Sequence, residues 1–274
     1  MNKINKIYYL GIPGSNSYLA ASMLAPKDKK LMGLSSFEEI FKQVQKDDRA
    51  TGVLPVENSL SGSIYEVYDL LAKSRTFISA ELIVRINHTL MQQKKTSLSR
   101  IRRCLSHPEV FRQCRRFFLK HPEIELVAVS DTASAAKMLK DSGPEFAAIA
   151  NPAAAVANSL EIVKQHLEDN SGNYSRFITI EKQLSQKGNK ISLSFNLIHQ
   201  PGSLFKALSP YARLGLNLTK IESRPIPGKL WEYLFYVDFE IDEKRHNLTE
   251  IIKEMKKFTE NLKVLGWYEA NKHI

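Results

Sequence analysis

The chain has 274 residues, 43% of them hydrophobic and 25% charged, and its formal net charge is +10 at pH 7. This composition excludes a disordered or fibrous protein, and the length favours two globular units over one. No apolar run is long enough to span a bilayer, and the apolar part of residues 1–14 is short for a secretory signal. The two cysteines, Cys104 and Cys114, lack the spacing of metal ligands. We therefore expect a cytoplasmic protein without a metal ion or another cofactor.

The positive charge could indicate a nucleic-acid-binding protein, and basic residues do cluster at 100–103, 112–116 and 253–257. These clusters fall in predicted helices or just before them and match no nucleic-acid-binding signature, so solvated helix faces explain them better. A positive field also attracts a small anionic metabolite and raises its rate of encounter. We expect partners that include neither nucleic acid nor a membrane.

Four segments in the first part of the chain share one plan, in which a hydrophobic strand leads through small polar residues into a helix. Ser15 or Ser17 is a suitable N-cap for the first helix, and Ser63 with Glu66 forms a capping-box pattern before the second. Alternating strands and helices indicate an α/β sheet, whose ligands gather beyond the carboxyl ends of the strands. Free amides at helix starts also suit anions. The predicted strands are 7–12, 51–56, 124–129 and 146–150, and the predicted helices are 18–24, 67–72, 133–139 and 153–160.

A different pattern follows the polar segment 181–189, which is typical of a linker. The order of elements beyond it is strand, helix, strand, strand, helix, strand. This βαββαβ order is that of a ferredoxin-like module covering roughly the last third of the chain. The predicted strands are 191–198, 216–221, 231–241 and 263–268, and the predicted helices are 203–214 and 248–258.

Ser175 and Arg176 form the most informative pair of polar residues, directly after the acidic, glycine-containing loop 168–172. The serine hydroxyl can donate a proton, and the planar guanidinium suits a carboxylate. The pair therefore predicts a pocket for a small organic acid.

Taken together, these segments resemble a prephenate dehydratase that carries a C-terminal ACT regulatory domain. The matching motifs occur in the family's order and extend over almost the whole chain. They are Gly-Ile-Pro-Gly-Ser at 11–15, Pro-Val-Glu-Asn-Ser at 55–59, Ser-His-Pro at 106–108 with Gln113 and Cys114, Asp-Thr-Ala at 131–133, and Ser-Arg-Phe at 175–177.

The resemblance implies a fold in the α/β class, with a two-lobed catalytic domain like the periplasmic binding proteins and a ferredoxin-like (βαββαβ) ACT domain. The catalytic domain would span residues 1–182. One lobe would comprise about 1–80 plus 169–182, and the other 81–168. The ACT domain would span residues 190–274.

The implied reaction removes carbon dioxide and hydroxide from prephenate and gives phenylpyruvate, in phenylalanine biosynthesis. Ser175 stands at the family's catalytic threonine and would donate a hydrogen bond or a proton to the leaving hydroxyl. Arg176 would bind a carboxylate or stabilise the loop, and Glu57 would either act as an acid or secure its loop by hydrogen bonds. The expected substrate-binding residues are Ser15, Asn58, Ser59, Thr132 and Phe177.

Three residues depart from the family's pattern. Serine at 175 keeps the hydroxyl but lacks the methyl group that restricts its rotamer in threonine. Asp131 stands where many relatives have serine, and would repel a dianion if it faced the pocket. Asn16 stands where relatives usually have an aromatic residue. His107, followed by a proline, is expected to cap a helix.

The C-terminal third carries two segments that resemble the family's phenylalanine site between paired ACT domains. The resemblance implies feedback inhibition by L-phenylalanine and a homodimer or homotetramer. Two alternatives stay open: dehydration of arogenate, which residues 130–137 also resemble, and a non-catalytic metabolite sensor. The expected effector-binding residues are Pro201, Gly202, Ser203, Leu204, Glu222, Ser223, Arg224 and Pro225.

Overall fold

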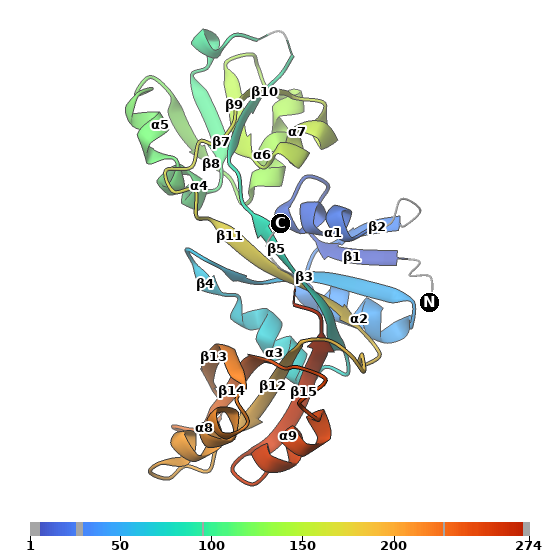
Figure 1. The fold of residues 1–274 in the computed structure, drawn as a ribbon. Helices are drawn as coiled ribbons and strands as arrows, with labels where there is room; N and C mark the ends of the chain where they lie inside the picture. The colour runs from blue at the N-terminus through green and yellow to red at the C-terminus, as the bar shows by residue number, and fades with distance from the viewer. Residues whose placement is uncertain (1–5, 26–29, 95, 227, 271–274) are drawn as a thin grey trace.

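The computed structural model describes residues 6–25, 30–94, 96–226 and 228–270. Figure 1 shows three parts in a row: an upper lobe, a middle lobe that contains the first strands, and a lower C-terminal module. The chain passes from the middle to the upper lobe and back, and then forms the module. Within the described ranges, no helix combines the length and hydropathy needed to cross a bilayer.

The middle lobe is a mixed sheet in the order β5-β11-β3-β1-β2. The strands β1, β2 and β3 are parallel, whereas β11 runs antiparallel to β3 and to β5. A short strand, β4, folds back on the end of β3. Helices α2 and α3 contribute to the core on one face of this sheet, and α1 to the core on the other. The bounds are β1 Lys6–Leu10, α1 Asn16–Leu24, β2 Lys30–Leu34, α2 Phe37–Lys46, β3 Ala50–Asn58, β4 Gly62–Ser63, α3 Tyr65–Lys73, β5 Phe77–Arg85 and β11 Tyr174–Glu181.

The upper lobe has its own sheet in the order β10-β6-β9-β7-β8. One core on this sheet includes residues of α4 and α5, and another includes residues of α6 and α7. The bounds are β6 Thr89–Gln92, η1 Leu98–Arg100, β7 Arg103–Ser106, α4 Pro108–Gln113, α5 Arg115–Leu119, β8 Glu125–Ala128, α6 Thr132–Met138, η2 Leu139–Asp141, β9 Phe146–Ala150, α7 Pro152–Asn158 and β10 Glu161–Lys164.

The C-terminal module has the βαββαβ order, with its strands arranged β13-β14-β12-β15. Helices α8 and α9 cover one face of these strands. Tyr236, Leu265 and Tyr268 on the other face belong to the core of the middle lobe. The pair Gly266 and Ile78 joins β15 to β5, so the sheet runs on from the middle lobe into the module. The bounds are β12 Lys190–Asn196, α8 Ser203–Arg213, β13 Asn217–Pro225, β14 Tyr233–Glu240, α9 Leu248–Met255 and β15 Glu260–Tyr268.

The predicted α/β class, the two lobes and the ferredoxin-like module are confirmed. Ser15 is the N-cap of α1, as its position predicted, and accepts a hydrogen bond from the amide of Tyr18. The predicted capping box at Ser63 is wrong. Ile64 stands at the N-cap of α3 without a side-chain cap, and the Ser63 hydroxyl donates to Glu222 instead.

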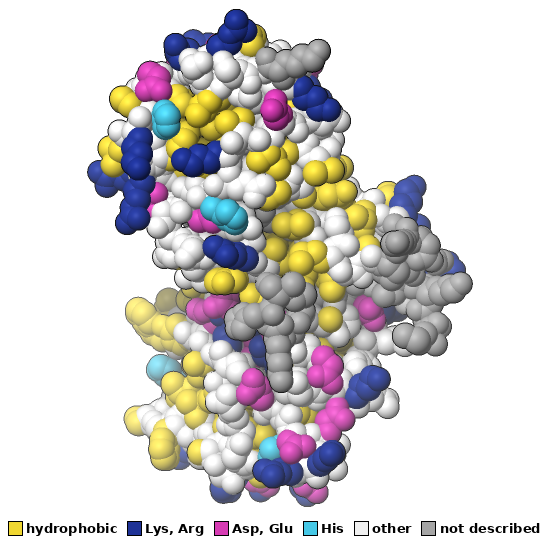
Figure 2. Space-filling model, turned by 45° about the horizontal axis from the view of Figure 1, so that its top comes forward, with side chains coloured by type: hydrophobic (Ala, Val, Ile, Leu, Met, Phe, Trp, Pro, Cys, Tyr) yellow, Lys and Arg dark blue, Asp and Glu magenta, His cyan; other side chains and the backbone are white. Residues whose placement is uncertain are grey.

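Surface charge is dispersed on the face shown in Figure 2. Its Lys and Arg side chains lie on both ends of the molecule, with acidic side chains near them. In one of the basic clusters, the side chain of Arg112 is 75% exposed and pairs with Glu109 on the same helix. Such contacts fit the prediction of solvated helix faces.

Candidate functional site

Asn58 and Ser175 are directly opposite each other on the antiparallel strands β3 and β11. The Asn58 side-chain amide donates to the Ser175 hydroxyl over 3.1 Å, to Asn173 Oδ1 over 2.7 Å and to the Tyr174 carbonyl over 3.1 Å. A serine oxygen that accepts a hydrogen bond keeps its own O–H as a donor. The arrangement therefore orients the Ser175 hydroxyl and leaves it able to donate.

The loop after β3 is tied to the segment that leads into β11. The side-chain oxygen of Asn58 accepts from the amides of Leu60 and Ser61, which holds the loop turned back on itself. The Ser59 hydroxyl donates to the Gly172 carbonyl and accepts from the Tyr174 amide. The structure thus brings Asn58, Ser59 and Ser175 together, as the sequence predicted.

Side chains of the upper lobe extend this hydrogen-bonded group. Asn173 donates to Gln113 Oε1 over 3.1 Å, and the same oxygen lies 2.6 Å from the Nε2 atom of His88. Sequence reasoning did not assign a role to Asn173 or His88. The position of Asn173, two residues before the Ser-Arg-Phe motif, was an available signal, whereas His88 stood in no motif.

His107 and Asp131 both cap helices. The Nδ1 atom of His107 accepts from the Glu109 amide at the start of α4, which confirms its predicted capping role. The Asp131 carboxylate accepts from the amide and the hydroxyl of Ser134. Burial opposes ionisation of Asp131, but these hydrogen bonds outweigh it and lower the pKa of the carboxyl group.

The other predicted substrate-binding residues are Ser15, Thr132 and Phe177, and each lies in a setting of its own. Besides capping α1, Ser15 donates to the Leu10 carbonyl. Thr132 is the first residue of α6 in the upper lobe. Phe177 is 1% exposed and packs in the core beside α1, so it supports β11 from within.

The two lobes touch where the loop after β1 meets the start of α7. The Asn151 side chain donates to the Gly14 carbonyl over 2.8 Å and to Asn16 Oδ1 over 2.9 Å. Gly14 has φ +92°, and a Cβ atom there would lie 2.7 Å from the Cα atom of Ala154. The contact between the lobes therefore requires glycine at position 14.

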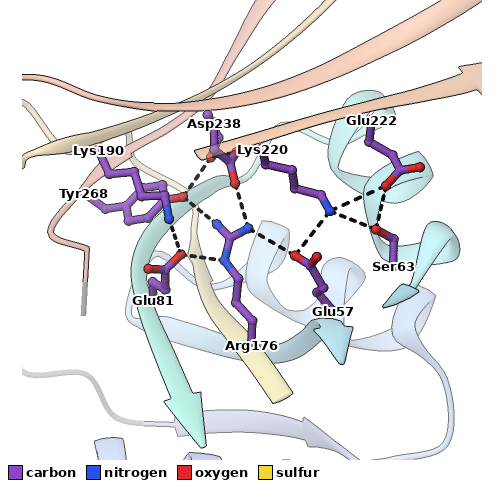
Figure 3. A network of polar contacts seen from close by, with 10 residues as sticks. Glu57, Ser63, Glu81, Arg176, Lys190, Lys220, Glu222, Asp238 and Tyr268 are labelled. Atoms are coloured by element: carbon purple, nitrogen blue, oxygen red, sulfur yellow. Dashed lines mark hydrogen bonds and ion pairs between the residues drawn. The ribbon is translucent and has the colours of Figure 1, made fainter. Parts of the chain in front are cut away.

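Arg176 faces the C-terminal module (Figure 3). Neighbouring residues of a strand point to opposite faces of the sheet, and the Arg176 side chain is 13% exposed. Its Nε atom lies 2.5 Å from Glu81 Oε2, its Nη1 atom lies 2.7 Å from Asp238 Oδ2, and its Nη2 atom donates to the Tyr268 hydroxyl. Burial opposes the charged guanidinium, but Asp238 and the other acidic neighbours raise the pKa of Arg176 well above its usual value. Arg176 thus pairs with carboxylates of the protein itself, those of Glu81 and Asp238.

Glu57 is the cross-strand neighbour of Arg176 and points toward the same module. Its carboxylate lies 3.2 Å from Lys220 Nζ and 3.9 Å from the Arg176 guanidinium. Lys190 of the module approaches within 2.8 Å of Glu81. Figure 3 shows these side chains as one network between the middle lobe and the module. Glu57 and Arg176 therefore occupy the junction between domains.

The predicted effector residues line two different surfaces of the module. Pro201, Gly202, Ser203 and Leu204 lie where α8 begins, and Ser203 and Leu204 line a cavity of about 410 Å³ together with Trp231, Tyr233 and Phe235. On β13, Glu222 accepts from the hydroxyls of Ser63 and Tyr65, and Arg224 lies 3.1 Å from Asp69. Ser223 and Pro225 are exposed. The Glu-Ser-Arg-Pro segment thus contacts the middle lobe of its own chain.

No cluster of three or more His, Cys, Asp and Glu side chains suited to a metal ion lies within the part of the chain that the structure describes. The groups that can act at Asn58 and Ser175 are neutral hydrogen-bond donors and acceptors. Such groups can orient an oxygen atom and stabilise charge that develops on it.

Comparison with known proteins connects this site to one enzyme family. The family profile described as prephenate dehydratase matches residues 7–185. The bifunctional chorismate mutase/prephenate dehydratase of Escherichia coli strain K12 is 31% identical over 282 residues, which cover 98% of this chain and 73% of that protein. Arogenate dehydratase 2 of Petunia hybrida is 36% identical over 296 residues, with coverage of 98% and 73%.

A solved structure gives the same result in three dimensions. The structure of prephenate dehydratase in complex with L-Phe from Arthrobacter aurescens superposes with a TM-score of 0.84 and 26% sequence identity. The superposition covers 96% of this chain and 89% of that one. With the profile matching more than half of the sequence, this chain belongs to the prephenate dehydratase family and is a carbon–oxygen lyase of phenylalanine biosynthesis.

Proposed function

We propose that Ser175, oriented by Asn58, donates a hydrogen bond to the hydroxyl group that leaves prephenate. In this reaction the bond from the ring to the carboxylate breaks and its electrons form the aromatic system. The bond to the hydroxyl breaks as well, and the departing hydroxide takes up a proton from the bulk solvent to become water. The observation that carries the proposal is the hydrogen bond of 3.1 Å from the Asn58 amide to the Ser175 oxygen, which aims the serine O–H.

Aromatisation provides the driving force, so the site has to orient the ring and stabilise the departing oxygen. A serine hydroxyl has an unsuitable pKa for a general acid, and its neighbour Asn58 is an amide that cannot relay a proton. We therefore assign Ser175 a hydrogen-bonding role without transfer of its own proton. Glu57 is engaged by Lys220, which favours the structural one of its two expected roles.

Substitution of the serine tests this role. Ser175→Ala is expected to lower kcat about 10²- to 10³-fold, the usual effect of losing one donor to a developing oxyanion, without loss of folding. Ser175→Thr keeps the hydroxyl and should retain most of the activity. Ser79→Ala is the matched control, because Ser79 on the adjacent strand β5 bonds to Thr179 and takes no part in the site. Near wild-type kcat in Ser175→Ala would remove Ser175 from the mechanism.

Arogenate is the second candidate substrate, because one relative of comparable identity is named arogenate dehydratase. The two substrates differ by an amino group in place of a keto group. Release of carbon dioxide from prephenate and from arogenate should be measured side by side with purified protein, and the ratio of the kcat/KM values decides the preference. Binding of either compound without release of carbon dioxide would instead indicate a metabolite sensor.

We also propose L-phenylalanine as the effector, bound at the start of α8. Gly202 at the N-cap has φ +80° and no side chain, so amides of the first helical turn are open to a carboxylate. The Ser203 hydroxyl is buried and has no hydrogen-bond partner among the residues that the structure describes, and Trp231, Tyr233 and Phe235 provide apolar walls. A relative has been solved with L-Phe. Calorimetric titration should give saturable heat together with inhibition, and the absence of both would contradict the site.

We propose that a second copy of the chain packs on the same face of the module. The side chains of Phe205 and Trp231 are 78% and 71% exposed, which is unusual for large apolar groups. A homodimer or a homotetramer would cover them, and light scattering with and without L-phenylalanine distinguishes these states from a monomer.

For the domains, we propose a catalytic part at residues 1–182 and an ACT part at 190–274. The strand β5 runs to Arg85 within the middle sheet, so the change of lobe fits better near residue 86 than at 81. The second crossing, before β11, agrees with the expected return near residue 169. Free, buried Cys104 and Cys114 fit the proposed cytoplasmic location.

A further inference from the structure

Lys220 on β13 occupies the point where the C-terminal module meets the strand that carries Asn58. Its side chain is 8% exposed, and its Nζ atom lies 3.2 Å from Glu57 Oε2 and 3.5 Å from Glu222 Oε2. It also donates to the Ser63 hydroxyl over 2.9 Å. Figure 3 shows the ammonium group between the two carboxylates, one from each domain. The buried ammonium group of Lys220 is therefore shared by the middle lobe and the module.

Two of the residues that hold Lys220, Glu57 and Ser63, belong to the hairpin of β3 and β4. Glu57 pairs with Ser63 across this hairpin, and Asn58 pairs with Gly62. The hairpin is thus bonded to Lys220 of the module through Ser63, and to Ser175 of β11 through Asn58. Movement of β13 relative to β3 must change the position of the hairpin or break these contacts.

We propose that Lys220 is a positioning residue through which the C-terminal module sets the placement of the Asn58–Ser175 pair, and that Glu222 competes with Glu57 for it. The proposal rests on the proposed role of Asn58 and Ser175 and names the regulation of that site. Both carboxylates lie within ion-pair distance of Lys220, but Glu222 lies on β13 with Lys220, whereas Glu57 lies on β3. A small shift of β13 relative to β3 therefore lengthens the contact with Glu57 and leaves Lys220 paired with Glu222. A ligand or a second copy that moves β13 would then act on the hairpin.

The charges around Lys220 explain why loss of its contact with Glu57 would affect Asn58 and Ser175. Glu57 has a second cation at 3.9 Å, the Arg176 guanidinium, which is also held by Asp238. Without Lys220, the Arg176 guanidinium is the cation that remains beside Glu57, whose side chain is 37% exposed. Glu57 is then expected to turn toward Arg176 and to shift the end of β3 with it. Asn58 is the last residue of β3, and Ser175 directly precedes Arg176 on β11. A shift of Glu57 and Arg176 would therefore displace both Asn58 and Ser175.

The main test is Lys220→Met, which keeps the aliphatic stem and removes the charge. We expect kcat to fall about 10- to 100-fold, as misplacement of a reacting group by about 1 Å does, with a much smaller change in KM. Lys220→Arg should restore much of the lost kcat. Lys229→Met is the control, because Lys229 pairs with Glu232 at 2.8 Å on the surface of the same module. A kcat for Lys220→Met equal to that of the control, in a variant with native melting, overturns the proposal.

The competition is tested with Glu222→Gln. If Glu222 draws Lys220 away from Glu57, this variant should need several-fold more L-phenylalanine for half-inhibition. The double variant Lys220→Met with Glu222→Gln should resemble Lys220→Met alone, because the two substitutions act through one contact. Independent, multiplicative effects would overturn the competition.

Hydrogen exchange gives a readout that does not need activity. The amides of residues 58–63 should exchange faster in Lys220→Met than in wild type or Lys229→Met, with or without turnover of prephenate. If wild type proves inactive toward prephenate but Lys220→Met still shows the faster exchange, the proposed function is contradicted. The role of Lys220 in placing the hairpin is then still supported. Should Lys220→Met fail to fold, Ser63→Ala removes one contact of the same ammonium without leaving a charge unpaired. Unchanged kcat and unchanged exchange in Ser63→Ala would then refute the proposal.

Discussion

The middle lobe has two junctions of opposite character. Toward the upper lobe it offers neutral groups: the Asn151 side chain bonds to Gly14 and Asn16, and Gly14 packs on Ala154. Toward the C-terminal module it presents charges, where Arg176, Lys190 and Lys220 meet acidic residues. The acidic residues of this second junction are Glu57, Glu81, Glu222 and Asp238.

The difference predicts how each junction moves. Water can replace a neutral hydrogen bond at a small net change in free energy, so the lobes can separate and close around a substrate. Separating buried ion pairs leaves charges poorly solvated unless water enters fully, which costs several kcal/mol per ion. We therefore expect the lobes to open and the middle lobe to keep its contact with the module. Regulation by the module would then act through small shifts within the charged junction.

The largest expected effect is that of Arg176→Met at the charged junction. This substitution leaves Glu81 and Asp238 buried with less positive charge, and should lower the free energy of unfolding by about 3–5 kcal/mol. Urea denaturation measures the change. The control is Arg213→Met, because Arg213 is 58% exposed, pairs with Glu254 on the surface and should contribute less than about 1 kcal/mol. Similar midpoints for both variants would show that the buried charges do not hold the junction.

A smaller effect is expected from Gly14→Ala at the neutral junction. The added Cβ would lie 2.7 Å from Ala154 Cα, which forces the lobes apart and should raise KM for the substrate about tenfold, equivalent to about 1.4 kcal/mol. Gly215→Ala is the control, since Gly215 has φ +66° and, among the described parts of the chain, no atom within 4 Å of the added Cβ. Both variants should lose about 1–2 kcal/mol of stability from the left-handed backbone. Equal KM values would mean that the lobes need not approach at this point.

The smallest effect is expected from Asn151→Ala. Asn151 caps α7 as well as joining the lobes, so its loss should cost about 1 kcal/mol of stability and raise KM a few-fold. Asn247→Ala provides the comparison, because Asn247 caps α9 and accepts from the Thr249 amide in the module. A rise in KM for both variants would indicate a general loss of order instead of a specific contact between the lobes.

Local sequence patterns correctly predicted the elements and helix caps that depend on neighbouring residues. The C-terminal βαββαβ order followed from hydrophobic periodicity, and Ser15 and His107 cap helices as their positions indicated. The strand β5 was not predicted, although it runs through the middle of the sheet. Its side chains serve two cores and a charged junction, so the segment lacks the simple alternation of a half-buried strand. Ser63 was assigned to a cap because a capping box is local, whereas its partner Glu222 is distant in sequence.

The sequence alone determined the family and the order of the elements in the C-terminal module, and it predicted that Asn58 and Ser175 lie together, because motifs and periodicity can be recognised along the chain. The tertiary structure decided which way the side chains of Ser175 and Arg176 point. Ser175 and Arg176 are neighbours on β11, and strand geometry sends them to opposite faces. Which of these faces meets the C-terminal module depends on the packing of distant strands. For that reason only the folded chain could show that Arg176 and Glu57 join the two domains.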